Sequence, residues 1–160
     1  YPLRRQRQMC IRDSRDIPAV TIPNGAGTVR VIAGEYQGHA GPAHTFTPMQ
    51  VWDVRLNQGS ISELPVPEGW NAAIIVLRGT VSVNGDAIAR DAQMVLLDRA
   101  GSGVTIEANN DAVVLLISGE PIDEAIVGHG PFVMNSHEEI VQAIDDFNSG
   151  RFAQIPARAG

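Results

Sequence analysis

The sequence predicts a mostly β fold, a barrel or sandwich, with one α-helix near the C-terminus. Turn-forming residues interrupt the chain at intervals of about 8–12 residues, the spacing typical of all-β domains. The 160 residues include 16 Gly and 10 Pro, and only 5% are aromatic. Asn84-Gly85 separates two short apolar runs. This dipeptide is the strongest short hairpin signal, because both residues tolerate a positive φ.

The expected strands begin with a short extended segment between Pro18 and Pro23. Segment 34–47 is interpreted as a loop, because it is rich in Gly and Pro. Side chains alternate along segment 49–56, and the more apolar set is expected to face the core: Gln50, Trp52, Val54 and Leu56. We expect further strands at residues 28–33, 49–56, 60–64, 71–77, 80–83, 87–89, 94–98, 104–107 and 113–118.

One helix is expected after this strand-rich body. Asn135 or Ser136 is its N-cap, and Ser136 with Glu139 forms a capping box. Gly150 follows as a C-terminal cap. Because the helix carries a single apolar stripe, it must dock on a sheet or on a partner. The stripe consists of Ile140, Val141, Ile144 and Phe147.

Residues 1–14 differ from the rest of the chain. They contain four Arg and the only Cys, Cys10, and show neither helical nor strand periodicity. They lack the apolar run of a secretory signal, and they form no amphipathic face that a transit peptide would present. The segment resembles translated sequencing-adapter read-through, so we exclude it from fold reasoning. Without it, the net charge is more negative than the −6 of the full chain.

The composition excludes several classes of protein. The 12 basic residues are all Arg and are outnumbered by 18 acidic residues, which argues against direct binding of nucleic acid. No apolar run approaches the roughly 18 residues of a membrane span. A single Cys excludes an internal disulfide and a Cys-only zinc site. We therefore expect a cytoplasmic protein that is bound to neither nucleic acid nor membrane.

No chemical motif is evident in the sequence. Ordinary hydrogen bonds are the expected role of His39 and His44, which lie in a Gly- and Pro-rich loop. His129 and His137 have no partner at the HxH or HExxH spacing of metal ligands, and His137 is expected to face solvent. Asp53, Glu120, Asp123 and Glu124 are candidate acid–base groups only if a pocket brings them together. The Gly25-Ala26-Gly27 segment leads into a strand rather than a helix, which excludes a dinucleotide site. The chain has no GxSxG nucleophile motif.

A family resemblance rests on four longer motifs. Segment 71–98 has the layout of a cupin barrel, and two pieces, residues 27–56 and 117–152, resemble the C-terminal domain of pirin-family proteins. The matching motifs are Gly34-Glu35-Tyr36-Gln37-Gly38, Gly119-Glu120-Pro121, Gly130-Pro131-Phe132-Val133-Met134-Asn135 and Gly150-Arg151-Phe152. The resemblance implies a cupin-like barrel, an RmlC-like jelly roll, as the C-terminal half of a two-cupin protein from a bacterium.

The resemblance also divides the chain. It implies a lead segment at 1–15, a barrel at 16–134, a helix at 135–152 and a disordered tail at 153–160. In the family the N-terminal cupin holds a metal, usually iron. Some bacterial members open quercetin with dioxygen, and eukaryotic members act as transcriptional co-regulators.

The general cupin ligand pattern finds no metal ligand in this chain. When the pattern is aligned on Gly79, the ligand positions of its first motif fall on Pro65, Pro67 and Ala72. The His of its second motif falls near Val104. None of these side chains binds a metal cation. We therefore expect no catalytic, cofactor-binding or metal-binding residue here, and no cofactor, with iron expected in the absent N-terminal domain.

With apolar ligand positions, the barrel should be filled by side chains. The expected filling is Ile74, Val76, Val81, Val83, Val95, Leu97, Val113, Leu115 and Ile117. In the resembling family the C-terminal helix braces the assembly with the N-terminal domain. The expected interface residues are therefore Ile140, Ile144 and Phe147, and exposure of this stripe favours self-association.

Two interpretations of function remain open at this point. In the first, the chain is a metal-free structural domain that braces the metal-bearing half of a quercetinase-like oxygenase. In the second, the parent protein is a metal-dependent or redox-dependent regulator without turnover. A self-sufficient ligand-binding cupin is disfavoured, because the ligand positions carry no donor atoms.

Overall fold

The computed structural model describes residues 14–151, which form two compact units. The first unit ends at Pro121 and the second begins at Ile122. The sequence placed the corresponding boundary later, between residues 134 and 135. Cys10, Phe152 and the expected tail lie outside the described residues.

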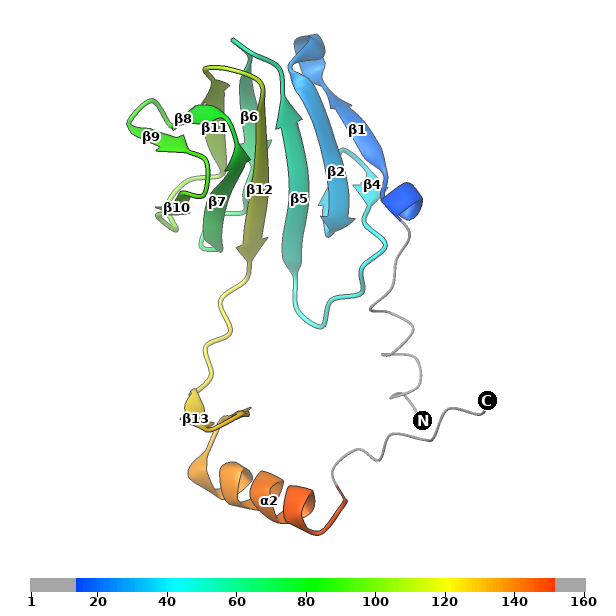
Figure 1. The fold of residues 1–160 in the computed structure, drawn as a ribbon, viewed down its shortest axis with the longest axis vertical. Helices are drawn as coiled ribbons and strands as arrows, with labels where there is room; N and C mark the ends of the chain where they lie inside the picture. Colours follow the sequence, from blue (N-terminus) through cyan, green and yellow to red (C-terminus); the bar gives the residue numbers. More distant parts are fainter. Residues whose placement is uncertain (1–13, 152–160) are drawn as a thin grey trace. The chain divides into compact units, whose positions relative to one another are not determined.

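The first unit consists of two main β-sheets and two short 3-10 turns (Figure 1). The larger sheet has six strands in the order β1-β2-β5-β12-β7-β10, and the smaller has the order β6-β11-β8-β9. The turns are η1 (Ser14–Asp16) and η2 (Pro23–Gly25). The strands of the larger sheet are β1 (Ala19–Ile22), β2 (Gly27–Ala33), β5 (Met49–Leu56), β7 (Asn71–Arg78), β10 (Met94–Leu97) and β12 (Ala112–Gly119). Those of the smaller sheet are β6 (Ile61–Pro65), β8 (Thr80–Val83), β9 (Ala87–Arg90) and β11 (Gly103–Ala108).

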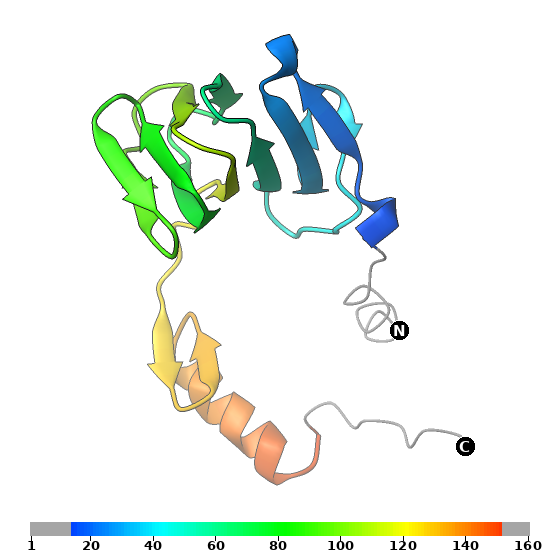
Figure 2. The same ribbon diagram turned by 45° about the horizontal axis from the view of Figure 1, so that its top comes forward.

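The core lies between these two sheets, whose arrangement is also visible in Figure 2. The six-stranded sheet contributes one face of alternating side chains, and the four-stranded sheet contributes another. Trp52 is the largest side chain that is fully buried there. Other completely buried residues are Val29, Val31, Val54, Leu64, Ile74, Val76, Val81, Val104, Ile106, Val114 and Leu116. The two sheets confirm the predicted mostly β fold. The burial of Trp52, Val54 and Leu56 confirms which face of β5 was expected to point into the core.

Segment 34–47 contains more structure than the sequence predicted. It forms a short hairpin of β3 (Glu35–Tyr36) and β4 (His39–Ala40). Gln37 and Gly38 connect the strands, both with positive φ, as a type I′ turn requires. The same turn geometry occurs at Asn84-Gly85 between β8 and β9, which confirms the predicted hairpin.

The expected phase of β12 was wrong. Val113, Leu115 and Ile117 are only half-buried, whereas Ala112, Val114, Leu116 and Ser118 point into the core. A continuous apolar run has no alternation, so it cannot show which face is internal. Among the other expected filling residues, Ile74, Val76, Val81 and Val83 are in the core, and Val95 and Leu97 pack against it.

The second unit is small and consists of a hairpin and a helix. Strands β13 (Val127–His129) and β14 (Phe132–Met134) pair with each other, and α2 (His137–Asn148) contacts both. The sequence predicted the helix but not the hairpin. Among residues 14–151, no helix is long and apolar enough to cross a membrane.

Candidate functional site

The structure gathers the four cupin ligand positions at one end of the sandwich. Pro65 pairs with Gly103, which precedes Val104 in β11. Ala72 pairs with Leu97 on the neighbouring sheet. A cavity of about 70 Å³ lies at this end, lined in part by Val66, Pro67, Trp70, Leu97 and Gly103. Of the four predicted positions, Pro67 lines this cavity, Pro65 is exposed beside it in sequence, and Ala72 and Val104 are buried.

The donor atoms around this cavity do not suit a metal. Val104 and Ala72 are buried hydrocarbon side chains, and a proline side chain has no lone pair to offer. Asp98 is a carboxylate in the lining, and its Oδ1 accepts a hydrogen bond from the Ala100 backbone N–H at 3.2 Å. The neighbouring Arg99 is a cation that opposes metal binding. An iron or zinc ion therefore does not fit the residues present.

The four His are not brought together into a site. His39 lies in β4, with its Nδ1 3.0 Å from the Gln37 carbonyl oxygen, and His44 lies in the loop before β5. His129 and His137 belong to the second unit. Within residues 14–151, no three His, Cys, Asp or Glu side chains form a group that could hold a metal ion.

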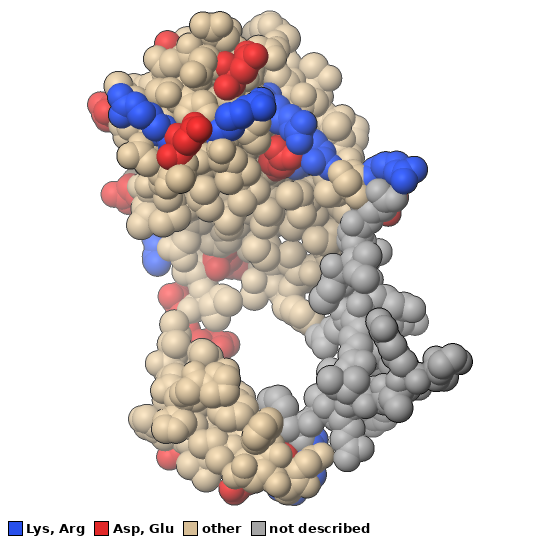
Figure 3. All heavy atoms as spheres, viewed as in Figure 1, with Lys and Arg blue, Asp and Glu red and all other residues tan. Residues whose placement is uncertain are grey.

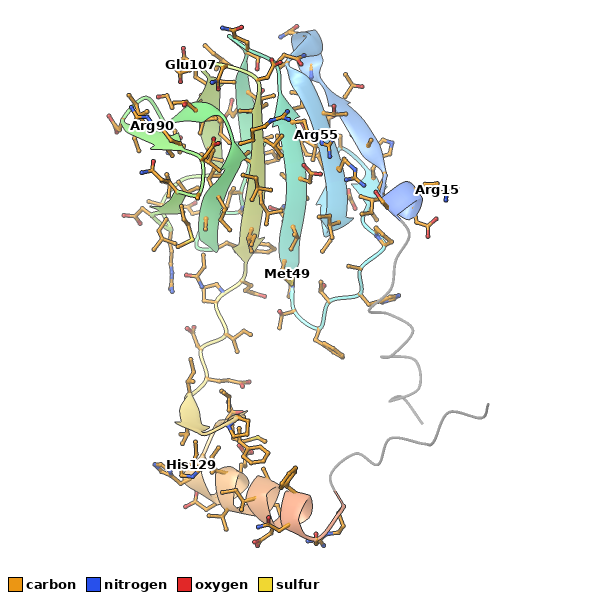
Figure 4. The ribbon with its side chains drawn as sticks, viewed as in Figure 1. Arg15, Met49, Arg55, Arg90, Glu107 and His129 are labelled. Carbon is orange, nitrogen blue, oxygen red and sulfur yellow. The ribbon has the colours of Figure 1, made fainter. Side chains whose placement is uncertain are left out.

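Asp53 is the carboxylate with the most developed surroundings. Its Oδ2 accepts hydrogen bonds from Arg30 at 3.1 Å and from Arg55 at 3.3 Å. Arg30 also donates to the backbone and hydroxyl oxygens of Ser14. Figure 3 shows basic side chains in a band across this face of the first unit, and Figure 4 shows Arg55 and Met49 at opposite ends of β5. Asp53 is thus held in an ion-pair cluster rather than in an acid–base pocket.

The other candidate carboxylates do not meet Asp53. Glu120 follows β12 and is exposed, as are Asp123 and Glu124 in the second unit. Glu124 accepts a hydrogen bond from the Asn135 side-chain amide at 2.7 Å. These carboxylates stabilise the chain locally or face solvent.

The first family-like motif, residues 34–38, has a packing role in the structure. Tyr36 is buried against Trp52, with ring centroids 5.0 Å apart in an edge-to-face arrangement. Burial raises the pKa of Tyr36, although the hydrogen bond from Gln37 acts in the opposite direction. Gly34 adopts a φ of +75° beside the backbone of Met49. The motif therefore anchors the β3–β4 hairpin on the core.

The expected interface residues lie in the second unit and differ in exposure. Ile140 is buried and Ile144 half-buried, whereas Phe147 is 63% exposed and forms an edge-to-face pair with Phe132 at 6.3 Å. Part of the predicted stripe thus covers the hairpin of its own unit. Exposed apolar side chains remain at Ile122, Ile126, Val133 and Val141.

The capping box confirms the predicted start of the helix. The Ser136 hydroxyl accepts from the Glu139 backbone N–H at 3.2 Å, and the Glu139 carboxylate accepts from the backbone N–H groups of Asn135 and Ser136. Hydrogen bonds from its own backbone N–H and from Ser136 lower the pKa of Glu138 in the same turn. These groups satisfy donors that a helix leaves open.

Replacing Ser136 by Ala is expected to destabilise α2 by about 1 kcal/mol, because an N-cap acceptor is lost. Hydrogen exchange of the α2 amides measures the effect. Ser149→Ala, at the other end of the helix, is the control, since the Ser149 hydroxyl donates to the Asp146 carbonyl and accepts from Arg151 Nε but does not cap the start of the helix. Equal protection in both variants would contradict the role of Ser136.

Sequence reasoning missed the cluster around Asp53 and the contact between Tyr36 and Trp52. The residues of each group are separated in sequence and meet only through strand pairing. The sequence offered one signal for this cluster: alternation places Asp53 and Arg55 on the same face of segment 49–56. The contact of Arg30 with Asp53 could not be predicted, because it depends on the register of β2 against β5, in which the two residues lie opposite each other.

Comparison with known sequences gives a family match and several relatives. The sequence profile of the Pirin C-terminal cupin domain matches residues 51–153. A protein of Pseudomonas aeruginosa named "Putative quercetin 2,3-dioxygenase" is 56% identical over 137 residues, which are 86% of this chain and 48% of that protein. Pirin of Mus musculus is 34% identical, over 93% of this chain and 54% of its own length. The chain thus spans about half the length of these curated relatives.

A solved structure has the same fold. The quercetin 2,3-dioxygenase from Acinetobacter baumannii superposes with a TM-score of 0.81 at 40% sequence identity. The match covers 89% of this chain and 50% of that one. This likeness confirms the cupin-like fold that the sequence predicted.

Proposed function

The chain belongs to the pirin family, through its C-terminal cupin domain, and from this premise we propose that it is a metal-free structural half of a two-cupin protein. Its role is to brace a second cupin, which lies outside this chain and carries iron. The parent protein is proposed to be a quercetin 2,3-dioxygenase-type enzyme of the cytoplasm. The names of the relatives from Pseudomonas aeruginosa and Acinetobacter baumannii support this substrate class.

One observation carries the proposal: the ligand positions of this cupin hold no metal-binding atoms. Pro65 and Pro67 are exposed, and Ala72 and Val104 are buried in hydrocarbon surroundings. The cavity beside Pro67, about 70 Å³, has room for a few water molecules but not for a flavonol. A domain with this interior contributes stability and surface rather than chemistry.

The second unit supports the bracing role. Its described part holds only 30 residues, from Ile122 to Arg151, which is too few to bury a core of its own. It exposes Ile126 and Val133 by 83% and 66%. We propose that this unit uses its apolar surface, including Ile144 and Phe147, to bind the iron-bearing half.

Metal analysis of the purified chain is the first test. We expect no stoichiometric iron, zinc, copper or nickel by elemental mass spectrometry, because the donor set is missing. The control is the same chain after treatment with a chelator. One metal ion per chain that survives dialysis would overturn the metal-free assignment.

The oxygenase part needs a protein with both halves. Joining the N-terminal half of the Pseudomonas aeruginosa relative to residues 17–153 of this chain gives such a two-half protein. We expect it to bind iron and to consume quercetin together with dioxygen. Iron binding without quercetin consumption would overturn the oxygenase proposal and favour a metal-dependent regulator, while leaving the metal-free role of this half intact.

A further inference from the structure

Two asparagines of this chain are followed by glycine, and the structure places both in turns with positive φ. They are Asn24, in η2 between β1 and β2, and Asn84, between β8 and β9. The φ angles are +60° and +68° at Asn24 and Gly25, and +53° and +75° at Asn84 and Gly85. All four residues are exposed. The two sites are therefore matched in sequence, in the sign of φ and in exposure.

An Asn-Gly pair reacts with itself in water without an enzyme. The glycine backbone nitrogen loses its proton to hydroxide and attacks the side-chain carbon Cγ of the asparagine. A bond from nitrogen to Cγ forms, the bond from Cγ to Nδ2 breaks, and the amide nitrogen leaves as ammonia. Water then opens the cyclic imide at either of its two carbonyls, which gives aspartate or isoaspartate. One water is consumed, and no oxidant or cofactor is required. Glycine favours the reaction because it has no side chain to shield its nitrogen.

The structure holds the Asn84 side chain away from this reaction. Its Oδ1 accepts a hydrogen bond from the Thr105 backbone N–H at 2.9 Å. The Asn84 backbone N–H also donates to the Thr105 carbonyl oxygen, at 2.8 Å. The pairing of Val83 with Ala87 closes the turn directly beside it. Rotation of Cγ onto the nitrogen of Gly85 would break the first of these bonds, which slows the attack.

The Asn24 side chain is not held in this way. Among residues 14–151, no hydrogen bond ties its amide to another group. The turn closes on a long hydrogen bond, 3.3 Å from the Ala26 backbone N–H to the Pro23 carbonyl oxygen. A Cβ added to Gly25 would meet nothing within 4 Å, so the surroundings of the pair are open. A surface hollow of about 310 Å³, lined in part by Asn24, Gly25 and Asn57, gives water access to the pair.

The strands that flank the two turns also differ. β1 lies at the edge of the six-stranded sheet, whereas β8 lies between β11 and β9 in the smaller sheet. An edge strand has one neighbour to leave, so the turn at its end opens at a lower free energy than one beside an internal strand. The Asn24 side chain therefore reaches the geometry of attack more often than the Asn84 side chain.

We propose that Asn24 is a site of spontaneous modification, at which the folded protein is converted to aspartyl and isoaspartyl forms, and that Asn84 is protected. Each conversion adds one negative charge to the turn between β1 and β2. The isoaspartyl form also adds a methylene to the backbone ahead of Gly25. The Gly25 carbonyl oxygen accepts from Asn57 Nδ2 at 2.8 Å, so the longer backbone displaces this contact with the segment after β5.

Peptide mass spectrometry measures both sites in one sample of the 160-residue chain. Cleavage after Arg releases residues 16–30 and 79–90, and each of these peptides contains a single Asn and no Gln. The chain is incubated in mildly alkaline buffer, either folded or in urea, and is then digested briefly at mildly acidic pH. Conversion is measured from the mass of the acid in place of the amide, and isoaspartate from its separate elution.

We expect residues 16–30 to convert at least about tenfold faster than residues 79–90 in the folded chain. In urea the two peptides should convert at similar rates, because both contain the same reactive pair. Similar rates in the folded chain, or faster conversion of residues 79–90, would overturn the proposal. Asn24 that stays intact in the folded chain but converts in urea would overturn it as well.

Asn24→Gln and Asn84→Gln are matched variants, because the longer glutamine side chain closes a ring with the next nitrogen far more slowly. Isoaspartyl groups in the intact, aged protein are counted by enzymatic methylation of their carboxylates. The signal should be lost in Asn24→Gln and kept in Asn84→Gln. An unchanged signal in Asn24→Gln would assign the modification to another residue and overturn the proposal. Neither measurement requires iron or turnover, so the outcome is separate from that of the quercetin assay.

Discussion

Replacing Trp52 by Ala is expected to lower the free energy of unfolding by about 3–5 kcal/mol, because it removes the largest fully buried side chain of the core. The indole packs between the sheets and supports Tyr36 through the edge-to-face contact. The space that it leaves cannot be filled without moving several strands. Against a total stability of about 5–15 kcal/mol, a loss of this size leaves much of the chain unfolded at elevated temperature.

Urea denaturation followed by circular dichroism measures the effect without depending on the indole itself. Trp70→Ala is the control, because Trp70 is only partly buried at the edge of the core and should cost less. Trp52→Phe separates packing from hydrogen bonding. Trp52 Nε1 is buried with no partner among the described residues, so the loss of its N–H carries no hydrogen-bond penalty. If Trp52→Ala lowered the free energy of unfolding by less than about 1 kcal/mol, the tight packing expected around this side chain would be contradicted.

Replacing Gly34 by Ala is expected to cost about 2–5 kcal/mol, from backbone strain and from a clash together. Gly34 has a φ of +75°, and an added Cβ would lie 2.5 Å from the Met49 carbonyl oxygen. That oxygen belongs to the backbone of β5, so it cannot move aside as a flexible side chain would. The β3–β4 hairpin, and with it the position of Tyr36, should be displaced.

Gly59→Ala is a closely matched control. Gly59 has nearly the same φ, +74°, but an added Cβ there meets nothing within 4 Å. This variant should therefore cost only the strain of a positive φ, about 1–2 kcal/mol. Thermal unfolding of the two variants compares them directly. If Gly34→Ala and Gly59→Ala lowered the free energy of unfolding equally, the close approach of Gly34 to β5 would not contribute to the cost of the substitution.

The strand pattern of the first unit could be predicted because its signals are local. Alternation in residues 49–56 gave the internal face of β5, and Asn84-Gly85 gave the β8–β9 hairpin. The capping box at Ser136 likewise placed the start of α2. Each of these depends on neighbours within a few positions, which a single sequence displays.

The features that could not be predicted depend on long-range pairing. Val113, Leu115 and Ile117 were placed in the core, because an unbroken apolar run gives no phase. The β13–β14 hairpin was missed, since strands of three residues carry too little pattern to be distinguished from a loop. The ion pair between Arg30 and Asp53 became evident only from the register of β2 against β5.

The candidate site shows the same division. The absence of donor atoms at Pro65, Pro67, Ala72 and Val104 could be stated from the sequence, because it depends on residue types alone. That Pro67 lines a small cavity, whereas Pro65 is exposed and Ala72 and Val104 are buried, could be seen only in the structure. The residue types could thus be read from the sequence, whereas their exposure and burial could not.

The order of strands in the larger sheet has a consequence for folding during synthesis on the ribosome. β12 is the last strand of the first unit along the chain, yet it lies between β5 and β7 in the middle of the sheet. While a ribosome is still making residues 112–119, the sheet is split into two halves with an open seam. The nascent domain therefore stays incomplete until its final strand emerges, and closure then depends on contacts between distant parts of the chain, which form slowly. During that interval the edges of β5 and β7 are exposed to other chains, so this step is where chaperones would have the greatest effect on yield.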